Sequence, residues 1–211
     1  MLPRLHLVTA DALLGAPDFL ARAGALMAAF GPALALHLRA RQLTVRQLHE
    51  LAACAAADAL RTGAALFIND RVDIALAVRA GAHLHARSLP VREARRLLHY
   101  APLGYSAHEP DEAAVAAAEG ADHVFLGTIY ASTSHPDRQP AGPGLVAAVA
   151  PGLGVPVIAI GGVTPARVAE LLRAGAHGVA VISGVWAAPD PLAAAGAYLA
   201  ALAGASGVAE E

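Results

Sequence analysis

The sequence contains no lysine: all 15 basic residues among its 211 residues are arginine. This absence excludes Schiff-base chemistry, a PLP-anchoring lysine and a P-loop lysine, because each of these needs an ε-amine. Alanine supplies 55 residues, so the use of arginine for lysine fits a coding bias. The enzyme classes that remain possible are those whose positively charged site residues can be arginine.

The chain is also poor in clustered charge and in cysteine. Its formal net charge is −2 with no basic run, which argues against nucleic acid as a partner and favours a small molecule or a protein. Cys54 stands alone, so no intramolecular disulfide forms and a reducing cytoplasm is expected. The N-terminus has no basic segment followed by an apolar one, so no secretory signal is predicted. The uncharged stretch 139–166 holds five prolines and six glycines, which excludes a membrane helix.

Short apolar runs alternate with segments of helical period along the whole chain, without a linker. Thr44 and Thr164 are expected as helix N-caps, and the glycines at 63, 81, 120 and 175 as residues that end helices. The expected strands are Leu5–Val8, Ala33–Leu38, Ala65–Ile68, His83–His85, Leu103–Ser106, His123–Gly127, Val155–Ile160 and Gly178–Ile182. The expected helices are Phe19–Phe30, Val45–Thr62, Arg71–Ala80, Val91–Tyr100, Pro110–Glu119, Leu145–Ala150, Pro165–Ala174 and Pro191–Leu202.

Eight strand–helix units predict an α/β fold. Several strands are apolar on both faces, which is typical of a parallel sheet covered by helices. We therefore expect a single TIM (β/α)8 barrel over residues 1–205, with a flexible tail at 206–211; a doubly wound open sheet is the alternative. In a barrel the chemistry lies at the carboxyl ends of the strands.

Polar residues and glycines concentrate at those ends. Gly161 and Gly162 follow the seventh strand, and Ser183 and Gly184 follow the eighth. Glycines there allow backbone N–H groups to approach a ligand closely, and a short extra helix after Gly184 would complete a phosphate site. A phosphate ligand is predicted, although the glycines also serve simply to turn the chain.

Three other features offer alternatives. Asp70 is either a site carboxylate or an ordinary charge at a helix N-terminus. His83 and His85 share a strand face, as a metal-binding pair would; no third ligand has matching spacing, so they are interpreted as pocket or core histidines, and His37 is interpreted likewise. The Gly/Pro-rich loop 130–144 is either a binding loop or idle surface.

Taken together, seven segments resemble thiamine-phosphate synthase and its TenI-type relatives. They are HLRAR (37–41), NDRVDIALA (69–77), AHLHARSLP (82–90), YSAHEPDEA (105–113), GADHVFLGTIY (120–130), VPVIAIGGVTP (155–165) and GAHGVAVISGVW (175–186). The resemblance implies a TIM barrel. It also implies one of two reactions. The synthase joins a pyrimidine methyl diphosphate to a thiazole phosphate with Mg²⁺, and the TenI tautomerase aromatises a thiazole phosphate carboxylate without metal.

The resemblance assigns roles to particular positions. Asp70 takes the place of a Mg²⁺ carboxylate, Ser88 stands where the second carboxylate is expected, and Thr128 stands where the tautomerase has its catalytic histidine. The remaining substrate contacts that it implies are Arg39, Arg41, Asn69, His83, Ser106, Ser132, Ser134 and His135, with a thiazole phosphate on Gly161, Gly162, Val163, Ser183 and Gly184.

Ser88 and the sequence after residue 183 favour the TenI branch, so the leading interpretation is a thiazole tautomerase that needs no cofactor. Threonine has no useful pKa for general base work, so His37 or His108 would move the proton. The alternatives are a Mg²⁺-dependent thiamine-phosphate synthase, supported by Asn69 and Asp70, and a non-catalytic thiazole-phosphate-binding protein. The Leu/Ala-rich helix faces make a homodimer a further expectation.

Overall fold

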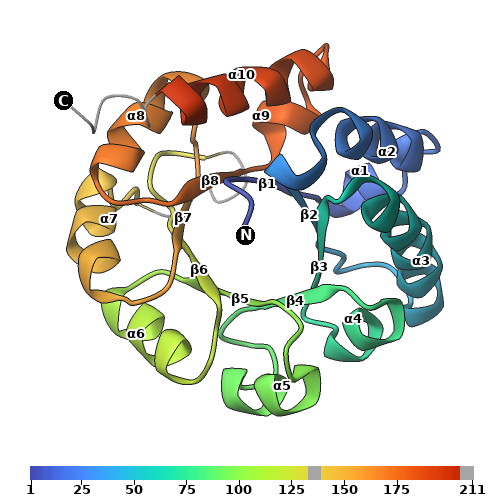
Figure 1. The fold of residues 1–211 in the computed structure, drawn as a ribbon, viewed down its shortest axis with the longest axis horizontal. Helices are drawn as coiled ribbons and strands as arrows, with labels where there is room; N and C mark the ends of the chain where they lie inside the picture. The colour runs from blue at the N-terminus through green and yellow to red at the C-terminus, as the bar shows by residue number, and fades with distance from the viewer. Residues whose placement is uncertain (133–138, 205–211) are drawn as a thin grey trace.

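The chain folds as a closed barrel of eight parallel strands surrounded by helices (Figure 1). The computed structural model describes residues 1–132 and 139–204. Each strand pairs with its neighbour in chain order, and β8 closes the barrel against β1 through Leu5↔Val179 and Leu7↔Val181. The strands are β1 (Leu5–Val8), β2 (Leu34–Leu38), β3 (Ala65–Asn69), β4 (Gly81–Leu84), β5 (Leu103–Ala107), β6 (His123–Leu126), β7 (Val157–Ile160) and β8 (Gly178–Val181). The predicted TIM barrel is confirmed.

The helices form the outer ring that Figure 1 shows around the strands. They are α1 (Asp11–Leu14), α2 (Phe19–Phe30), α3 (Val45–Thr62), α4 (Val72–Val78), α5 (Val91–Leu98), α6 (Pro110–Ala118), α7 (Pro143–Val149), α8 (Pro165–Arg173), α9 (Ser183–Trp186) and α10 (Pro191–Gly204), with 3-10 turns η1 (Gly31–Ala33) and η2 (Ala150–Gly152). None of the described helices is long and apolar enough to cross a membrane. The tail predicted at 206–211 lies outside the described residues.

Local sequence explains where several helices start and stop. Thr44 begins α3 with a capping box: its hydroxyl accepts from the Gln47 amide while the Gln47 side chain accepts from the Thr44 amide. Gly63 ends α3 at φ 77°, as a left-handed cap. The expectation for Gly81 was wrong, because Arg79 at φ 57° ends α4 and Gly81 already belongs to β4. Thr164 stands at the N-cap position of α8 but makes no side-chain cap bond.

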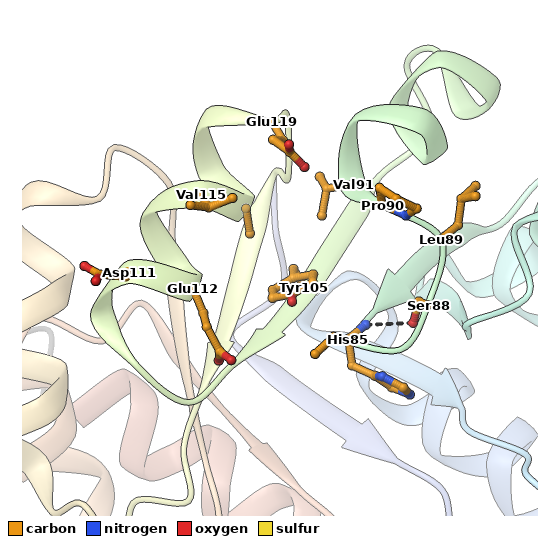
Figure 2. A pocket seen from close by; sticks show the side chains of 12 residues that line it. His85, Ser88, Leu89, Pro90, Val91, Tyr105, Asp111, Glu112, Val115 and Glu119 are labelled. Atoms are coloured by element: carbon orange, nitrogen blue, oxygen red, sulfur yellow. Dashed lines mark hydrogen bonds between the residues drawn. The ribbon is translucent and has the colours of Figure 1, made fainter.

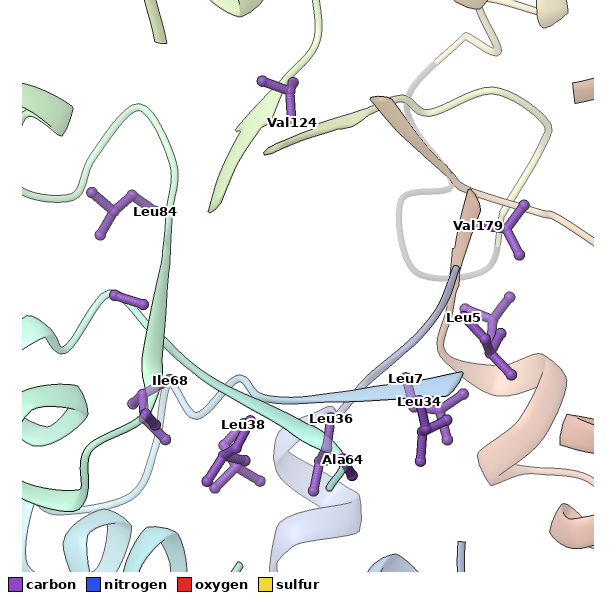
Figure 3. Close-up of a cluster of buried hydrophobic side chains, with 14 of the residues drawn as sticks. Leu5, Leu7, Leu34, Leu36, Leu38, Ala64, Ile68, Leu84, Val124 and Val179 are labelled. Carbon is purple, nitrogen blue, oxygen red and sulfur yellow. The ribbon is translucent and has the colours of Figure 1, made fainter. Parts of the chain in front are cut away.

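The apolar core has two parts, one on each face of the barrel wall. The larger lies between strands and helices, where Leu5, Leu7, Leu36 and Leu38 point outward from β1 and β2 (Figure 3). The smaller lies inside the barrel and holds Val8, Phe125, Ile158 and Ala180. Because strand side chains alternate in direction, the residues between the outward leucines face inward. Several of these inward residues are histidines, which sets this interior apart from the branched apolar layers usual in such barrels.

Candidate active site

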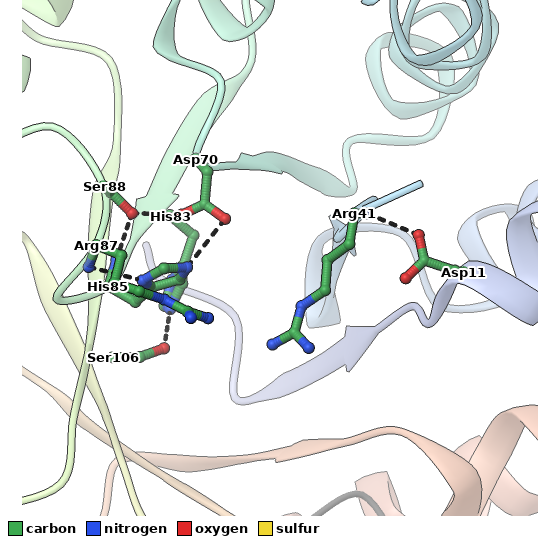
Figure 4. Close-up of polar contacts among 8 residues, drawn as sticks. All are labelled: Asp11, Arg41, Asp70, His83, His85, Arg87, Ser88 and Ser106. Carbon is green, nitrogen blue, oxygen red and sulfur yellow. Dashed lines mark hydrogen bonds and ion pairs between the residues drawn. The ribbon is translucent and has the colours of Figure 1, made fainter. Parts of the chain in front are cut away.

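The carboxyl ends of β2, β3 and β4 bring charged residues together at one edge of the barrel mouth (Figure 4). Arg39 and Arg41 follow β2, Asp70 follows β3, and His85 and Ser88 follow β4; Figure 4 draws all of these except Arg39. Parallel strands deliver their last residues to the same end of a barrel, which explains why segments so distant in sequence meet. Of these five residues, only His85 was not predicted as a site residue. Its spacing from His83 was the only signal.

Asp70 is the carboxylate at this edge, and two neighbouring side chains contact its oxygens. The Ser88 hydroxyl donates to its Oδ1, and Nε2 of His85 lies 3.2 Å from its Oδ2. The Arg87 amide donates to Nδ1 of His85, so the ring proton belongs on Nε2, where it faces the carboxylate. The backbone at Asp70 adopts a left-handed φ of 64°, which turns the chain away from the strand into α4.

The two arginines lie on a loop whose backbone is held by hydrogen bonds to Asp11 and Thr9. Asp11 accepts from the amides of Arg41 at 2.6 Å and Gln42 at 3.0 Å, and Thr9 Oγ1 accepts from the Arg39 amide at 2.9 Å. Arg39 is half-buried, and its pKa is lowered by burial and by the Arg41 charge, against the raising effect of Asp11 and Asp70. Arg39 therefore experiences the charges of both the second guanidinium and the carboxylates, and this edge combines two arginines with the carboxylate of Asp70.

A Mg²⁺ ion fits this donor set. Mg²⁺ prefers oxygen ligands and is commonly bound by one or two carboxylates, with substrate phosphates and water completing its shell. Asp70 supplies one carboxylate, and Ser88 places a hydroxyl oxygen against it. Any further charge would come from a phosphorylated substrate, which the two arginines also suit.

The loops after β7 and β8 expose backbone amides. Two side chains fix the carbonyls of the β7 loop: Arg167 Nη1 donates to Gly162 O at 2.7 Å, and Tyr198 OH donates to Val163 O at 2.9 Å. The amides of Gly162 and Val163 donate to no other residue of the described chain. Gly162, at φ 60°, is required by packing, because a Cβ there would strike Ala131 O.

Ser183 and Gly184 form the start of α9, whose first N–H groups have no partner within the helix. The short extra helix that the sequence predicted after Gly184 is therefore present, two residues earlier than expected. A side chain at Gly184 would strike the Tyr198 hydroxyl, so glycine is needed for α10 to pack here. The arrangement suits the predicted phosphate site, which stays a prediction.

His108 and Thr128 lie at the ends of β5 and β6. The ring of His108 is bonded through Nδ1 to Gly127 O, and its own amide donates to Glu112 at 2.7 Å. A carbonyl only accepts, so Nδ1 carries the proton and Nε2 holds the lone pair of a potential base. Thr128 is 9% exposed and lies against Gly161, where a side chain would strike it.

Other predicted site residues lie deeper than expected. His37 is fully buried inside the barrel, where it bonds to His6, and its pKa is well below the ordinary value because of burial. This placement does not fit the expected proton-transfer role. His83 is 1% exposed and bonds to Ser106 at 2.8 Å, and burial lowers its pKa to about 3. Asn69 is 8% exposed, and its Oδ1 has no hydrogen-bond partner among the described residues.

The loop after β6 is described only at its ends. Ser132 is partly buried, whereas the predicted contacts Ser134 and His135 lie outside the described residues. Tyr130 joins this loop to α8, because its hydroxyl donates to Glu170 at 2.7 Å and Arg167 lies 4.2 Å over its ring. Burial and the Glu170 contact raise the pKa of Tyr130 to about 12.

A cavity of about 480 Å³ lies beside this edge, on the outside of the barrel between α5 and α6 (Figure 2). It shares His85 and Ser88 with the Asp70 cluster. Its other polar lining residues are Tyr105, Asp111, Glu112 and Glu119. Three carboxylates repel a phosphate, so the barrel mouth, and not this cavity, is the candidate site.

Comparison with known proteins decides the family. The family model TMP-TENI, described as thiamine monophosphate synthase, matches residues 5–185. The chain belongs to this family. It is 42% identical to a thiamine-phosphate synthase of Chloroflexus aurantiacus over 167 residues, which cover 78% of this chain and 77% of that protein. It is 41% identical to the thiamine-phosphate synthase of Salinispora arenicola over 95% of this chain and 98% of that one.

Among solved structures, a thiamine phosphate pyrophosphorylase from Pyrococcus furiosus superposes with a TM-score of 0.84 at 27% identity, covering 96% of each chain. The predicted membership of the thiamine-phosphate synthase and TenI family is confirmed, and this membership supports an enzyme of thiamine biosynthesis. These relatives carry the synthase name, so they favour the synthase alternative over the tautomerase interpretation that the sequence favoured.

Proposed function

We propose that this protein is a Mg²⁺-dependent thiamine-phosphate synthase, which joins a pyrimidine methyl diphosphate to a thiazole phosphate and releases pyrophosphate. The observation that carries the proposal is the edge where Arg39 lies within electrostatic range of both Arg41 and Asp70. A diphosphate leaving group needs several compensating positive charges, and guanidinium groups bind phosphate oxygens through paired N–H donors. The names of the most similar relatives support the same reaction.

In this reaction the bond between the pyrimidine methylene carbon and the diphosphate oxygen breaks, and its electron pair stays on the diphosphate. The thiazole nitrogen donates its lone pair to the methylene carbon, which forms the new C–N bond. Arg39 and Arg41 would stabilise the charge that develops on the diphosphate. Mg²⁺, when bound by Asp70 and Ser88, would neutralise further charge on the same group.

The thiazole phosphate would be held by the backbone amides of Gly162, Val163, Ser183 and Gly184. This places a monophosphate across the mouth from Asp70 and Ser88, because β7 and β8 lie on the other side of the barrel from β3 and β4 (Figure 1). Binding through amides requires no lysine, which agrees with a chain that has none.

Proton transfer separates the synthase from the tautomerase. Joining the two rings creates a thiazolium cation and moves no proton, so Thr128 at the position of the tautomerase histidine is no obstacle. Aromatisation of a thiazole carboxylate requires a base, and threonine does not provide one near neutral pH. The tautomerase remains a second candidate because Ser88 replaces a Mg²⁺ carboxylate and because Nε2 of His108 is available as a base.

The test supplies purified protein with both synthase substrates and Mg²⁺, and measures pyrophosphate and thiamine phosphate. Release of both in equal amounts, abolished by chelation and strongly reduced in Asp70→Asn, is expected. Asp73→Asn is the matched control, since it removes the same charge three residues away on the exposed start of α4. Background release in the presence of excess Mg²⁺ would refute the synthase. Aromatisation of the thiazole carboxylate phosphate would then indicate the tautomerase, and thiazole phosphate binding without turnover the non-catalytic protein.

A further inference from the structure

Four imidazoles occupy the interior of the barrel. His6 comes from β1, His37 from β2, His83 from β4 and His123 from β6, and each is at most 1% exposed. Their rings are neighbours, with centroids 5.1 Å apart for His6 and His37 and 5.5 Å apart for His6 and His123. None of the reaction steps proposed above uses them. Four polar side chains have therefore replaced apolar filling at the centre of the fold.

Half of the eight ring nitrogens in this cluster lack a hydrogen-bond partner within the described chain. Nδ1 of His37, Nδ1 of His83 and both ring nitrogens of His123 are buried and unpaired within the described chain. Leaving one buried polar group unpaired costs about 1–3 kcal/mol, so four such atoms would destabilise the barrel substantially. A ligand that accepts nitrogen lone pairs would reduce this cost, because it would satisfy one nitrogen of each ring that it binds.

The nitrogens converge as metal ligands do. One ring nitrogen from each of His6, His37 and His123 lies within 4.8 Å of the other two. A Zn²⁺ ion binds imidazole at about 2.0–2.1 Å, which places ligand nitrogens about 3–4 Å apart. Side-chain rotations that move each nitrogen by about 1 Å would thus bring all three within bonding distance of one ion. We propose that the barrel interior binds one Zn²⁺-class divalent ion through His6, His37 and His123, as a structural site separate from the barrel mouth.

The hydrogen bonding of His6 supports this assignment. Its Nε2 is bonded to Pro3 O at 2.9 Å, and a carbonyl only accepts, so Nε2 carries the proton and the Nδ1 lone pair points to His37 at 2.8 Å. A metal-ligating histidine typically donates its other N–H to a backbone carbonyl in this way. The proton between the two rings therefore belongs to Nε2 of His37, and binding of an ion at that nitrogen would move it to Nδ1 of the same ring, which has no partner in the described chain.

The cluster is also in the right ionisation state. Burial lowers the pKa of His6, His37 and His123 well below the ordinary value, and the neighbouring imidazoles lower it further. Neutral imidazole is the form that binds metals. The three rings are therefore available as ligands at neutral pH.

Gly104 keeps the space beside the cluster open. A Cβ at this position would strike Nδ1 of His83 and Nε2 of His123, so the two nitrogens border the same gap next to the β5 backbone. Nδ1 of His83 has no partner in the described chain, and it carries a lone pair when Nε2 donates to Ser106.

The donor set decides the class of metal. The cluster offers only imidazole nitrogens, which suit Zn²⁺, Co²⁺ or Ni²⁺, whereas Mg²⁺ prefers oxygen ligands. Full burial closes the site to substrate, as is usual for structural zinc. A metal held by three strands of the barrel would stabilise its closure, and it would have no direct part in the reaction at the mouth.

The test uses the whole chain, unfolded with denaturant and chelator and then refolded with Co²⁺ as a spectroscopic probe. One equivalent per chain should give the visible absorption of a low-symmetry nitrogen-ligated ion, and equimolar Zn²⁺ should displace it. X-ray absorption of the Zn²⁺-loaded protein should show at least three nitrogen ligands at about 2.0–2.1 Å. Absence of stoichiometric binding, or a shell made only of oxygens, would overturn the proposal.

Variants locate the ion. His123→Phe keeps an aromatic ring in the same space without nitrogens and should weaken Co²⁺ binding at least a hundredfold. His49→Ala, which removes an exposed histidine of α3, should leave binding unchanged, as should Asp70→Asn at the mouth. Binding that survives His123→Phe but is lost in Asp70→Asn would place the ion at the mouth and contradict the interior site. If His123→Phe does not fold, the absorption spectrum of the unaltered chain decides.

Discussion

The packing around Gly104 allows a sharp test of the barrel interior. In Gly104→Ala the added methyl group would overlap imidazole atoms of His83 and His123. Favourable contacts between such atoms lie at about 3.5–4.0 Å, so both rings would have to move by about 1 Å. They have little room, because the His123 ring is enclosed by Phe67 at 5.1 Å and Phe125 at 5.7 Å between centroids.

Inserting a methyl group into such a core costs about 1–3 kcal/mol. For a chain of this size each kcal/mol lowers the melting temperature by about 2–4 °C, so Gly104→Ala should melt about 3–10 °C lower. Circular dichroism during heating and urea titration measures the loss. Gly144→Ala is the matched control, since it lies in α7 with nothing within 4 Å of the added carbon. Equal melting temperatures for the two variants would refute the tightly packed cluster.

Three further changes test other parts of the structure. Thr44→Ala removes the capping box of α3 and should lower the free energy of unfolding by about 0.5–2 kcal/mol, measured by urea titration; an unchanged midpoint would mean that the cap is idle. Ser88→Asp adds a carboxylate beside Asp70 and, if the synthase proposal holds, should lower the Mg²⁺ concentration for half-maximal rate about tenfold; no change would argue against a metal at this edge. In metal-free protein the four interior histidines have lowered pKa values, so the unfolded chain binds protons first as the pH falls below about 6.5. The free energy of unfolding should keep its full value above that pH and should decrease at lower pH, by roughly 1 kcal/mol per histidine and pH unit. Equal urea midpoints at about pH 7.5 and 5.5 would contradict this expectation.

The fold could be predicted because the spacing of apolar residues and the residues that start and end helices indicate the same elements along the chain. Both α2 and α3 have the predicted bounds. An apolar face marks each helix in the sequence, and the Thr44 cap and Gly63 mark the two ends of α3. The error at Gly81 arose because glycine was assigned to the helix end, whereas Arg79 adopts the left-handed conformation instead. A single arginine at positive φ leaves no pattern in the sequence, and strand β4 therefore begins earlier than expected.

The site was predicted less completely because sequence shows which face a side chain occupies but not its depth. Arg41, Asp70 and Ser88 lie at the mouth as predicted, since they follow strand ends. His37 and His83 stand on the same inward face as mouth residues but one layer below, and period-two alternation does not distinguish the layers. His85 illustrates the converse: it follows the end of β4 and reaches Asp70, yet its spacing from His83 suggested only a shared face.

Depth also explains how one barrel can accommodate two unlike cation sites. Near the mouth, water and substrate phosphates can complete the shell of a hard ion, so the proposed Mg²⁺ site needs only one carboxylate and a hydroxyl from the protein. In the interior the cluster is buried and its donors are imidazole nitrogens, so the ion proposed there takes nitrogen ligands from the protein. The Asp70 edge and the histidine cluster therefore differ in ligand chemistry because they differ in access to solvent, and a substitution at either should leave the other in place.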